Sequence, residues 1–336
     1  MSRTAHGSVT LQVEVEELPL KEPFRITGRT FTSMQVVVVI VGSEGYVGRG
    51  EASGIYFRAD DDVPGILKAI ESVRPVVEAG IDRVALQSLL PPCGARNALD
   101  CALWDLEAKR AHRAVWQLAQ LAQPRPLLTT FTLGADTPDR MTTGALGFPQ
   151  AKALKLKLTG QAEDADRVRQ VRAARQDTWL AVDANQGFTR AGFEQLLPVL
   201  IEARVQLVEQ PLPLGQEAEL ENLRSPIPIA ADESVLGLED LPRLVGRFDA
   251  INIKLDKCGG LTEGLAMAHA ARRLGLAVMV GNTIGSSLAT APAFLVGQLC
   301  SVVDLDGPAL LATDRSPGVV YTEGKITCSD AVWGGP

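Results

Sequence analysis

The sequence predicts an α/β fold, namely a (β/α)8-type TIM barrel with an N-terminal α+β capping domain that the C-terminal segment completes. Two observations support this prediction. Short apolar runs recur roughly every 25 residues in the second half of the chain, the length that a strand, a loop, a helix and a return loop take together. Eight such runs are present, the number of strands in a closed barrel: LTTFTL, ALKLKL, WLAVD, VQLVE, IPIAAD, AINIK, LAVMVG and SVVDLD.

The first third of the chain has a different pattern. The segments SVTLQVEVEEL, MQVVVVIV and YVGRGEA are typical of strands. Two helical patterns follow at about 63–79 and 95–110, and the Pro- and Gln-containing stretch LAQPRPL at 121–127 indicates a join between domains. Residues 1–122 are therefore expected to form the α+β capping domain.

Beyond this join, strands and amphipathic helices alternate, so residues 123–314 are expected to form the barrel. An open doubly wound sheet is the competing architecture, but such a sheet normally binds its ligand at one switch point that few loops supply. Here at least six of the apolar runs end in polar residues, and no G-x-G-x-x-G follows a strand. Residues 315–336 are too few for a domain and are predicted to pack back onto the capping domain.

The composition argues against several classes of partner. The 336 residues are 46% hydrophobic and 22% charged, as in a globular protein with a sizeable core. A net charge of −7 without a Lys/Arg-rich run argues against nucleic acid as a partner. No apolar run approaches the ~18 residues of a membrane span, and the N-terminus lacks an apolar export signal, so we expect a cytoplasmic protein without a membrane partner. The sequence is compatible with a homo-oligomer.

Cysteine and histidine usage narrows the chemistry. The five cysteines are scattered and form no C-x-x-C pair, which is typical of reduced thiols that serve as packing residues. Of the three histidines, His6 lies at the terminus, while His112 and His269 fall in helical patterns. So few histidines disfavour both Ser-His-Asp hydrolysis and a histidine-ligated zinc site.

Five charged residues lie at or just past the ends of consecutive apolar runs. They are Lys157, Asp183, Glu209, Asp232 and Lys254. In a closed barrel, polar residues at the C-terminal ends of the strands converge on one mouth. Three carboxylates there, with open positions for water and substrate, suit Mg²⁺, a hard cation that prefers oxygen ligands. The alternative, that all five are surface charges at loop starts, does not account for their shared register.

The two lysines point to proton transfer. Strands 2 and 6 of an eight-strand barrel face each other, so Lys157 and Lys254 can approach a ligand from opposite sides. Removing a proton next to a carboxylate requires a cation for the developing charge and a neutral base. Like-charge repulsion from Lys155, two residues away on the same strand face, is expected to help Lys157 lose its proton. Two opposed lysines that exchange protons on opposite faces would racemise or epimerise a substrate.

The series K-x-K, D-A-N, E-Q-P, A-D-E-S and N-I-K-L-D-K-C-G-G, in this order, resembles the enolase superfamily in its muconate-lactonizing-enzyme-like branch. The likeness covers nearly the whole chain, including the capping-domain helix that begins with the segment ARNALD. It implies metal ligands at Asp183, Glu209 and Asp232, and an acid/base pair at Lys157 and Lys254.

A second motif, D-L-D-G-P, ends the eighth apolar run. Period-2 alternation places Asp304 and Asp306 on the same side of strand 8, which lies opposite strand 4 and therefore opposite Glu209. One interpretation is structural, because Asp-Gly pairs are typical of turns and aspartate is typical of helix N-caps. The functional interpretation is a clamp for an ammonium group, several ångströms from a carboxylate that the metal holds. A dipeptide has that layout.

This D-x-D is similar to the signature of dipeptide epimerases, typically those that act on L-Ala-D/L-Glu in murein peptide recycling. The resemblance implies that Thr132 and Lys155 also contact the substrate and that Arg29 pairs with a glutamate side chain. Solvation at the surface is the alternative for Arg29, and the acidic run at 60–62 would suit a cationic side chain instead. The stretch at 281–287 is more polar than in close relatives, so the pocket for the first residue differs.

Other enzymes compete with this interpretation. Within the superfamily, a cycloisomerase, an o-succinylbenzoate synthase or an N-acylamino-acid racemase would act on a substrate without a free ammonium, so the Asp304/Asp306 pair counts against them. A Schiff-base aldolase or a pyridoxal-phosphate enzyme would use a barrel lysine but would not need three aligned carboxylates. The sequence therefore predicts a Mg²⁺-dependent isomerase that epimerises the second residue of an L-Ala-D/L-Glu-like dipeptide, with epimerases of other dipeptides as the alternative.

Overall fold

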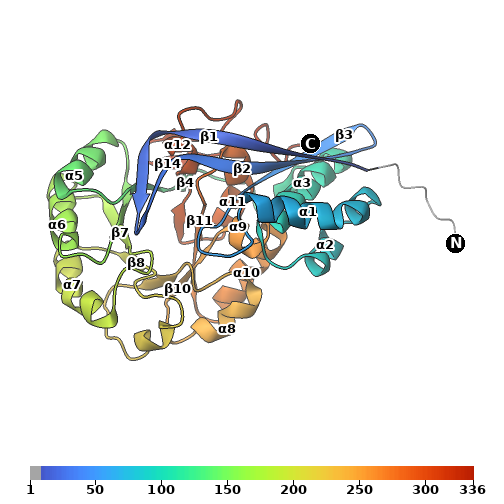
Figure 1. Cartoon of the computed structure of the whole chain (residues 1–336). Coiled ribbons are helices and arrows are strands. Elements are labelled where there is room, and N and C mark those ends of the chain that lie inside the picture. The colour runs from blue at the N-terminus through green and yellow to red at the C-terminus, as the bar shows by residue number, and fades with distance from the viewer. Residues whose placement is uncertain (1–8) are drawn as a thin grey trace.

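The computed structural model describes residues 9–336 of the chain. An antiparallel sheet with its own helices lies beside a parallel barrel (Figure 1). His6 lies outside the described residues, and all five cysteines are free thiols. Within the described part of the chain, no helix is both long and apolar enough to cross a membrane.

The N-terminal sheet consists of three strands in the order β1-β2-β3. They are β1 (Thr10–Ile26), β2 (Arg29–Ser43) and β3 (Tyr46–Ser53). The helices that follow are α1 (Val63–Glu78), α2 (Arg83–Leu89), α3 (Gly94–Ala111) and the short α4 (Val115–Leu118). The two helical patterns in the sequence correspond to α1 and α3, so the predicted α+β architecture is confirmed.

Helix α3 approaches β3 closely because two glycines leave room for it. A Cβ atom at Gly48 would lie 2.0 Å from the carbonyl oxygen of Ala102, and a Cβ atom at Gly50 would lie 2.0 Å from that of Ala98. Side chains at these two positions would therefore push the helix away. The close approach lets the apolar side of the helix bury the valines of the neighbouring strand, including Val37.

Eight parallel strands form the barrel, and each predicted apolar run contains one of them. Adjacent strands pair in chain order from β5 to β12. The strands are β5 (Thr130–Leu133), β6 (Ala153–Lys157), β7 (Trp179–Asp183), β8 (Leu207–Glu209), β9 (Ile229–Ala231), β10 (Ala250–Ile253), β11 (Ala277–Gly281) and β12 (Val302–Asp304). The two end strands meet where the backbone N–H of Leu305 donates to Thr129 Oγ1 at 2.9 Å. The predicted barrel architecture is therefore confirmed.

Helices connect most of the barrel strands. They are α5 (Pro138–Gly147), α6 (Asp164–Ala174), α7 (Arg190–Glu202), α8 (Leu241–Leu244), α9 (Leu255–Cys258), α10 (Leu261–Arg273), α11 (Ser287–Gly297) and α12 (Gly307–Leu310), with 3-10 turns η1 (Glu217–Leu220) and η2 (Leu238–Asp240). The connection from β8 to β9 has only η1, where a helix was expected. Prolines at 211, 213, 226 and 228 lack backbone N–H groups and disfavour helix there.

The hairpin of β1 and β2 extends from the N-terminal sheet to the mouth of the barrel (Figure 1). At its tip, the Thr27 hydroxyl donates to the carbonyl oxygens of Leu158 at 3.0 Å and Ala184 at 3.2 Å, just beyond β6 and β7. The carbonyl oxygen of Arg25 accepts from the N–H of Ala135 at 2.8 Å. These contacts fix the hairpin over the C-terminal ends of the barrel strands.

The C-terminal segment contacts both parts of the fold. Its strands β13 (Val320–Thr322) and β14 (Lys325–Thr327) form a small sheet with β4 (Leu127–Leu128) at the start of the barrel. Beyond this sheet, Trp333 Nε1 donates to the carbonyl oxygen of Arg49 on β3 at 2.8 Å. The segment thus completes the cap as predicted, while the boundaries 1–122, 123–314 and 315–336 stay predictions.

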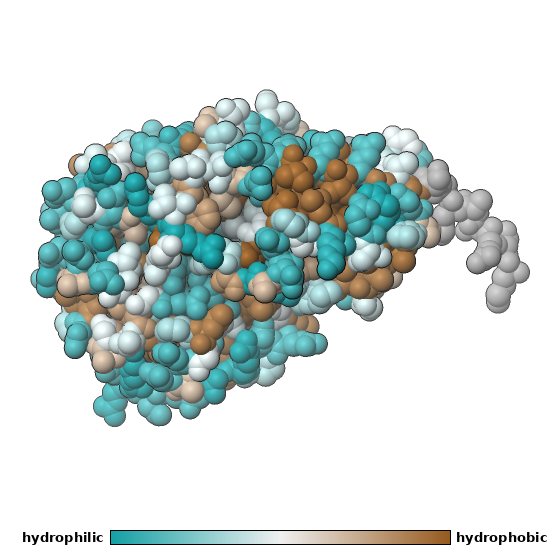
Figure 2. All heavy atoms as spheres, in the orientation of Figure 1, coloured by the Kyte–Doolittle hydropathy of each residue, from teal (hydrophilic) through white to brown (hydrophobic). Residues whose placement is uncertain are grey.

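The molecular surface differs between the two parts of the fold. Hydrophobic atoms gather over α1 and the adjoining part of the N-terminal sheet, whereas α5 and α6 present mostly hydrophilic atoms (Figure 2). This pattern fits amphipathic barrel helices that bury one side against the strands.

Asp105 is a buried anchor for the C-terminal segment, which leads to a prediction. Its carboxylate accepts from the N–H of Arg49 at 2.8 Å and the N–H of Gly334 at 3.0 Å, and it pairs with Lys109 Nζ at 2.9 Å. The substitution Asp105→Ala leaves two buried N–H groups without a partner, so the free energy of unfolding in urea should fall by about 3 kcal/mol. Glu107→Ala on the same helix removes only a partly exposed ion pair and should cost less than about 1 kcal/mol. Equal losses in the two variants would contradict this anchoring role.

Candidate active site

The five strand-end residues predicted from the sequence lie together at the barrel mouth. Strand pairing places Lys157 beside Asp183, and Asp183 beside Glu209. Asp232 and Lys254 follow β9 and β10 directly. Because β6 and β10 are four positions apart in the eight-strand order, the two lysines come from opposite sides of the barrel.

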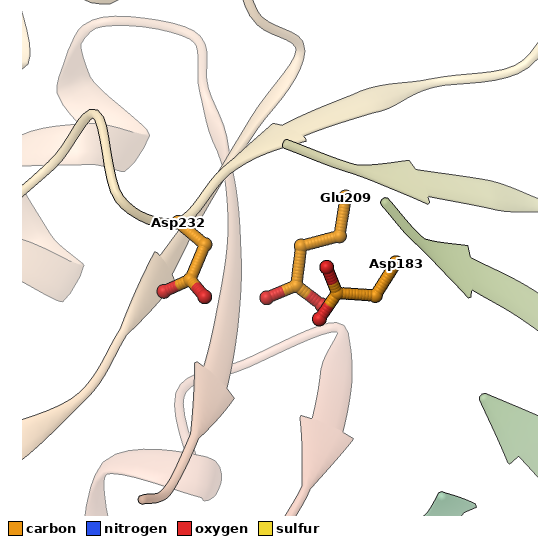
Figure 3. Close-up of side chains that lie close together, drawn as sticks. All are labelled: Asp183, Glu209 and Asp232. Atoms are coloured by element: carbon orange, nitrogen blue, oxygen red, sulfur yellow. The ribbon is translucent and has the colours of Figure 1, made fainter. Parts of the chain in front are cut away.

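The three carboxylates converge. Asp183, Glu209 and Asp232 each offer an oxygen, and these oxygens all lie within 4.8 Å of one another. Their side chains point toward a common centre from neighbouring strands (Figure 3). All three are at most 1% exposed, so the cluster is shielded from bulk water. A buried set of hard oxygen donors can hold a metal ion.

Lysine side chains provide the counter-charges for two of these carboxylates. Lys157 Nζ lies 2.5 Å from Asp183 Oδ2, and Lys254 Nζ lies 2.7 Å from Asp232 Oδ2. The other oxygen of Asp232 lies 2.6 Å from Nζ of the buried Lys257. Burial by itself would raise the pKa of both aspartates, but the neighbouring ammonium groups outweigh it and lower both pKa values. Both aspartates are therefore held ionised.

Glu209 has less compensation. Burial, reinforced by the charges of Asp183 and Asp232, raises the pKa of Glu209 to about 8. Its Oε1 accepts from Asn252 Nδ2 at 2.6 Å, and its Oε2 lies 3.2 Å from Lys155 Nζ. Glu209 is hard to ionise because it is buried between two carboxylates. A bound cation would stabilise its ionised form. The residues present therefore fit a metal ion.

The ammonium of Lys155 contacts Asp304 Oδ2 as well as Glu209. Burial lowers its pKa, but the charges of Asp304 and Glu209 more than reverse this effect and raise it well above the ordinary value. The sequence led us to expect that Lys155 would repel the charge of Lys157. In the structure, the carboxylates of Asp304, Glu209 and Asp183 offset the charge of Lys155, with Asp183 at 3.6 Å. The effect of Lys155 on Lys157 therefore stays a prediction.

Asp304 and Asp306 both lie next to β5. Asp306 Oδ2 accepts from the backbone N–H of Thr132 at 2.5 Å, and Asp304 Oδ1 lies 3.5 Å from the Thr132 hydroxyl and also accepts from Thr130. Asp306 precedes α12, but its side chain makes no capping hydrogen bond to that helix. Burial and the adjacent Asp304 raise the pKa of Asp306 to about 6. The structure therefore does not use Asp306 as a side-chain N-cap.

A cavity of about 100 Å³ connects the two lysines with the hairpin and the loop after β3. Its polar wall contains Lys157, Lys254 and Asp232. Its apolar wall comes mainly from the N-terminal sheet and its loops, and consists of Phe24, Ile26, Phe31, Met34, Ile55, Tyr56, Phe57 and Ile284. A molecule in this cavity would have charged groups on one side and apolar side chains on the other.

Arg29 lies outside this wall, at the exposed start of β2. Its guanidinium carbon is 5.0 Å from the ring centroid of Tyr56, a cation–π contact. Arg25, the other arginine of the hairpin, is paired with Asp136 at 2.8 Å. Within the described part of the chain, Arg29 is therefore the unpaired one of these two arginines, and it contacts the cavity wall through Tyr56.

A larger open hollow of about 760 Å³ lies elsewhere, between the β2–β3 turn, α2 and α3. It contains none of the strand-end residues. Its two arginines are already paired, Arg83 with Glu107 at 2.7 Å and Arg110 with Glu44 at 2.8 Å. The smaller cavity contains Asp232 and Lys254, whose pKa values are shifted, against the effect of burial, by their mutual contact, and is therefore the candidate site.

Sequence reasoning missed several polar residues that surround the triad. Asn252 could have been found, because period-2 alternation places it on the same face of β10 as Lys254. Asn185 and Glu233 stand within the quoted D-A-N and A-D-E-S motifs, but nothing in the motifs shows that they hydrogen-bond each other at 3.2 Å. Lys257 lies in the one-turn helix α9 and Tyr56 in the loop after β3, and both segments are too short for periodicity to indicate where their side chains point.

Two family models match the chain. Residues 8–119 match the mandelate racemase/muconate lactonizing enzyme N-terminal domain, and residues 143–331 match the enolase C-terminal domain-like family. The L-Ala-D/L-Glu epimerase of Escherichia coli strain K12 is 40% identical over 94% of this chain and 99% of its own length. The N-acetyl-D-glutamate racemase of a Pseudoalteromonas species is 36% identical over 89% of this chain and 95% of its own length.

A solved structure is similar in fold over almost the whole chain. It is an enolase family member from Agrobacterium tumefaciens with homology to dipeptide epimerases, crystallised with bound sodium and L-Ala-L-Glu. It is 41% identical, covers 97% of this chain and 100% of its own, and has a TM-score of 0.94.

The buried ammonium of Lys257 leads to a second prediction. Besides Asp232 Oδ1, it contacts the carbonyl oxygens of Asp232 at 2.5 Å and Asn252 at 3.1 Å. The substitution Lys257→Met would leave these groups uncompensated and should lower the free energy of unfolding by about 3–5 kcal/mol. Lys152→Met removes an exposed lysine and should change it by less than about 0.5 kcal/mol. Urea unfolding of the purified variants measures both, and an unchanged midpoint for Lys257→Met would refute the prediction.

Proposed function

The chain belongs to the mandelate racemase/muconate lactonizing enzyme family of the enolase superfamily, and from this premise we propose that it is an isomerase that epimerises dipeptides. The reaction would invert the α-carbon of the second residue of an L-Ala-D/L-Glu-like dipeptide. The relatives support this class of reaction, since the Escherichia coli protein is named an L-Ala-D/L-Glu epimerase.

The observation that carries the proposal is the placement of Lys157 and Lys254. Both line one cavity, and they come from β6 and β10 on opposite sides of the barrel. A carbon atom held between them can lose a proton to one amine and receive one from the other. Either lysine can serve as base, depending on the starting configuration, so the same pair would interconvert both epimers.

Asp183, Glu209 and Asp232 would hold the metal ion, and we propose Mg²⁺ because all of these donors are carboxylate oxygens. When bound, Mg²⁺ would stabilise the negative charge that develops on the substrate carboxylate as the α-proton leaves. The carboxylates that now pair with Lys157 and Lys254 would then share their charge with the cation. They would then attract the two ammonium groups less strongly, so a lysine could more easily give up its proton and act as a base.

The other end of the substrate would lie toward β12. We propose that Asp304 and Asp306 bind the ammonium of the first residue, with Thr132 and Lys155 fixing their position. Lys155 already pairs with Asp304, whereas Asp306 takes only hydrogen bonds from Thr132. Asp306 is therefore the stronger candidate for direct contact with the ammonium.

The side chain of the second residue would lie against the apolar wall of the cavity. A glutamate side chain has an apolar stem that fits this wall and a carboxylate that can reach Arg29 at its edge. We therefore propose L-Ala-D/L-Glu as the substrate, which connects the enzyme with murein peptide recycling in the cytoplasm. Dipeptides with other side chains are the alternative within the same reaction.

A second candidate function is racemisation of an N-acylated glutamate, because one relative at 36% identity is named N-acetyl-D-glutamate racemase. Such a substrate has the same carboxylate and side chain but no ammonium. Asp306 favours the dipeptide, because an acyl group would leave this buried carboxyl group without a cation to bind, whereas Asp304 already pairs with Lys155.

The proposed reaction predicts hydrogen exchange. In D₂O with Mg²⁺, L-Ala-L-Glu should gain deuterium at the α-carbon of its second residue and convert to the D epimer, as ¹H NMR would record. Lys157→Ala and Lys254→Ala should each abolish inversion, and each should retain exchange with one epimer only, because a single lysine can still act on its own face.

The controls for this experiment separate the metal from the protein. A chelator should stop exchange, and added Mg²⁺ should restore it. If the native protein bound Mg²⁺ by calorimetry but exchanged no dipeptide, the proposed function would be wrong.

The ammonium clamp makes a separate prediction. Asp306→Ala should raise KM for L-Ala-L-Glu by about 10- to 100-fold, since it removes a buried charge-assisted contact. The affinity for Mg²⁺ should change by less than about twofold, because the metal triad is intact. N-acetyl-L-Ala-L-Glu should be a poor substrate of the native enzyme. Equal activity on the free and acetylated dipeptides would refute the clamp.

A further inference from the structure

We propose that Tyr56 is a positioning residue that sets the preference for an acidic second side chain, because it holds Arg29 at the edge of the cavity. This inference rests on the proposed function and assigns the selection of the side chain to a residue that lies outside the metal and lysine machinery. Tyr56 belongs to the loop at residues 54–62, called the cap loop below, which follows β3.

The first step is the anchoring of Tyr56 to the barrel. Its hydroxyl donates to Glu233 Oε1 at 3.1 Å across the boundary between cap loop and barrel mouth. Glu233 is 2% exposed and directly follows Asp232, so its carboxylate has little freedom to move. A hydrogen bond to a buried carboxyl oxygen is costly to lose, because water cannot readily replace the phenol as its partner. The phenol ring is thereby held at a fixed place.

The second step is the support behind Glu233. Glu233 Oε1 also accepts from Asn185 Nδ2 at 3.2 Å, and the backbone N–H of Asn185 donates to Asp183 Oδ1 at 2.9 Å. The position of Tyr56 is thus connected through two buried side chains to one of the metal-binding carboxylates. These hydrogen bonds fix the position of the cap loop relative to the metal-binding carboxylates.

The third step is the contact between Tyr56 and Arg29. The guanidinium lies 5.0 Å from the ring centroid, and no carboxylate among residues 9–336 forms an ion pair with it. Arg25 on the same hairpin is different, because Asp136 already neutralises it at 2.8 Å. Arg29 therefore keeps its charge available for a ligand while the tyrosine ring limits where that charge can be.

These contacts would affect dipeptides with an acidic second side chain differently from those with an apolar one. An apolar side chain needs only the wall formed by Phe24, Phe31 and Phe57, which Tyr56 extends. A glutamate side chain needs the wall and, in addition, a cation at a fixed distance beyond it. Loosening Tyr56 should therefore weaken acidic substrates more than apolar ones.

The test compares two dipeptides in the native enzyme and its variants. The measured quantity is the ratio of kcat/KM for L-Ala-L-Glu to kcat/KM for L-Ala-L-Leu. Tyr56→Phe removes the hydroxyl that reaches Glu233 but keeps the ring, and it should lower this ratio about three- to tenfold, mainly through KM for the acidic dipeptide. Arg29→Gln should lower it at least as much, and the double variant should be no lower than Arg29→Gln alone, because Tyr56 acts through Arg29.

The matched control is Arg25→Gln, which removes a cation from the same hairpin without touching Tyr56. It should leave the ratio within about twofold of the native value. The proposal would be overturned if Tyr56→Phe had the native ratio. It would also be overturned if the ratio of the double variant fell by the product of the two separate effects. Failure of the proposed function looks different, since the native enzyme would then exchange neither dipeptide.

A second measurement does not depend on turnover. Amide hydrogen exchange of the cap loop in the Mg²⁺-loaded protein should be at least about threefold faster in Tyr56→Phe than in the native protein, because the anchor to Glu233 is lost. Glu233→Gln keeps an acceptor oxygen for the hydroxyl and should restore most of the native protection relative to Glu233→Ala. Unchanged exchange in Tyr56→Phe would overturn the proposal whatever the protein catalyses.

Discussion

The mouth of the barrel depends on one constraint, the neutralisation of buried carboxylates by buried ammonium groups. Asp183, Glu209 and Asp232 are nearly inaccessible to water, and isolated charges at such depth would be prohibitively unfavourable. Lysine ammonium groups lie 2.5–2.7 Å from Asp183 and Asp232, and another lies 3.2 Å from Glu209. The candidate site is therefore a balanced charge cluster, and a bound cation would redistribute that balance among groups already in place.

This cluster also explains why the cap must be fixed firmly to the barrel. The apolar wall that excludes water from the lysines comes largely from β1, β2 and the loop after β3. Buried polar contacts hold the two parts together: Arg96 on α3 donates to the carbonyl oxygens of Cys258 at 2.6 Å and Gly259 at 3.2 Å, and Asn97 donates to Asp256 at 2.9 Å. Contacts that are this specific favour one relative position of cap and barrel. A dry cavity thus depends on helix α3 as much as on the strands.

The sequence predicted the barrel and the strand-end residues because both follow from periodicity. Eight apolar runs matched eight strands, and alternation along each strand determined which side chains share a face. The sequence did not show where Lys155 would find its counter-charge, since Asp304 is distant in the chain and only the closure of the barrel brings the two together. It also did not reveal the chain from Asp183 through Asn185 and Glu233 to Tyr56. That chain crosses from barrel to loop, and loop directions are set by tertiary contacts that no local pattern encodes.

The attachment of Gly334 and Trp333 to Asp105 and to the carbonyl of Arg49 has a consequence for biosynthesis. During translation the N-terminal domain leaves the ribosome first, yet the Arg49 carbonyl on β3 and the Asp105 carboxylate on α3 gain these C-terminal partners only after the whole barrel has been made. Contacts between such distant parts of a chain form late and slow the final folding step. The cap is thus the first part to be synthesised and the last to be completed, so the cavity that it closes is finished only at the end of folding.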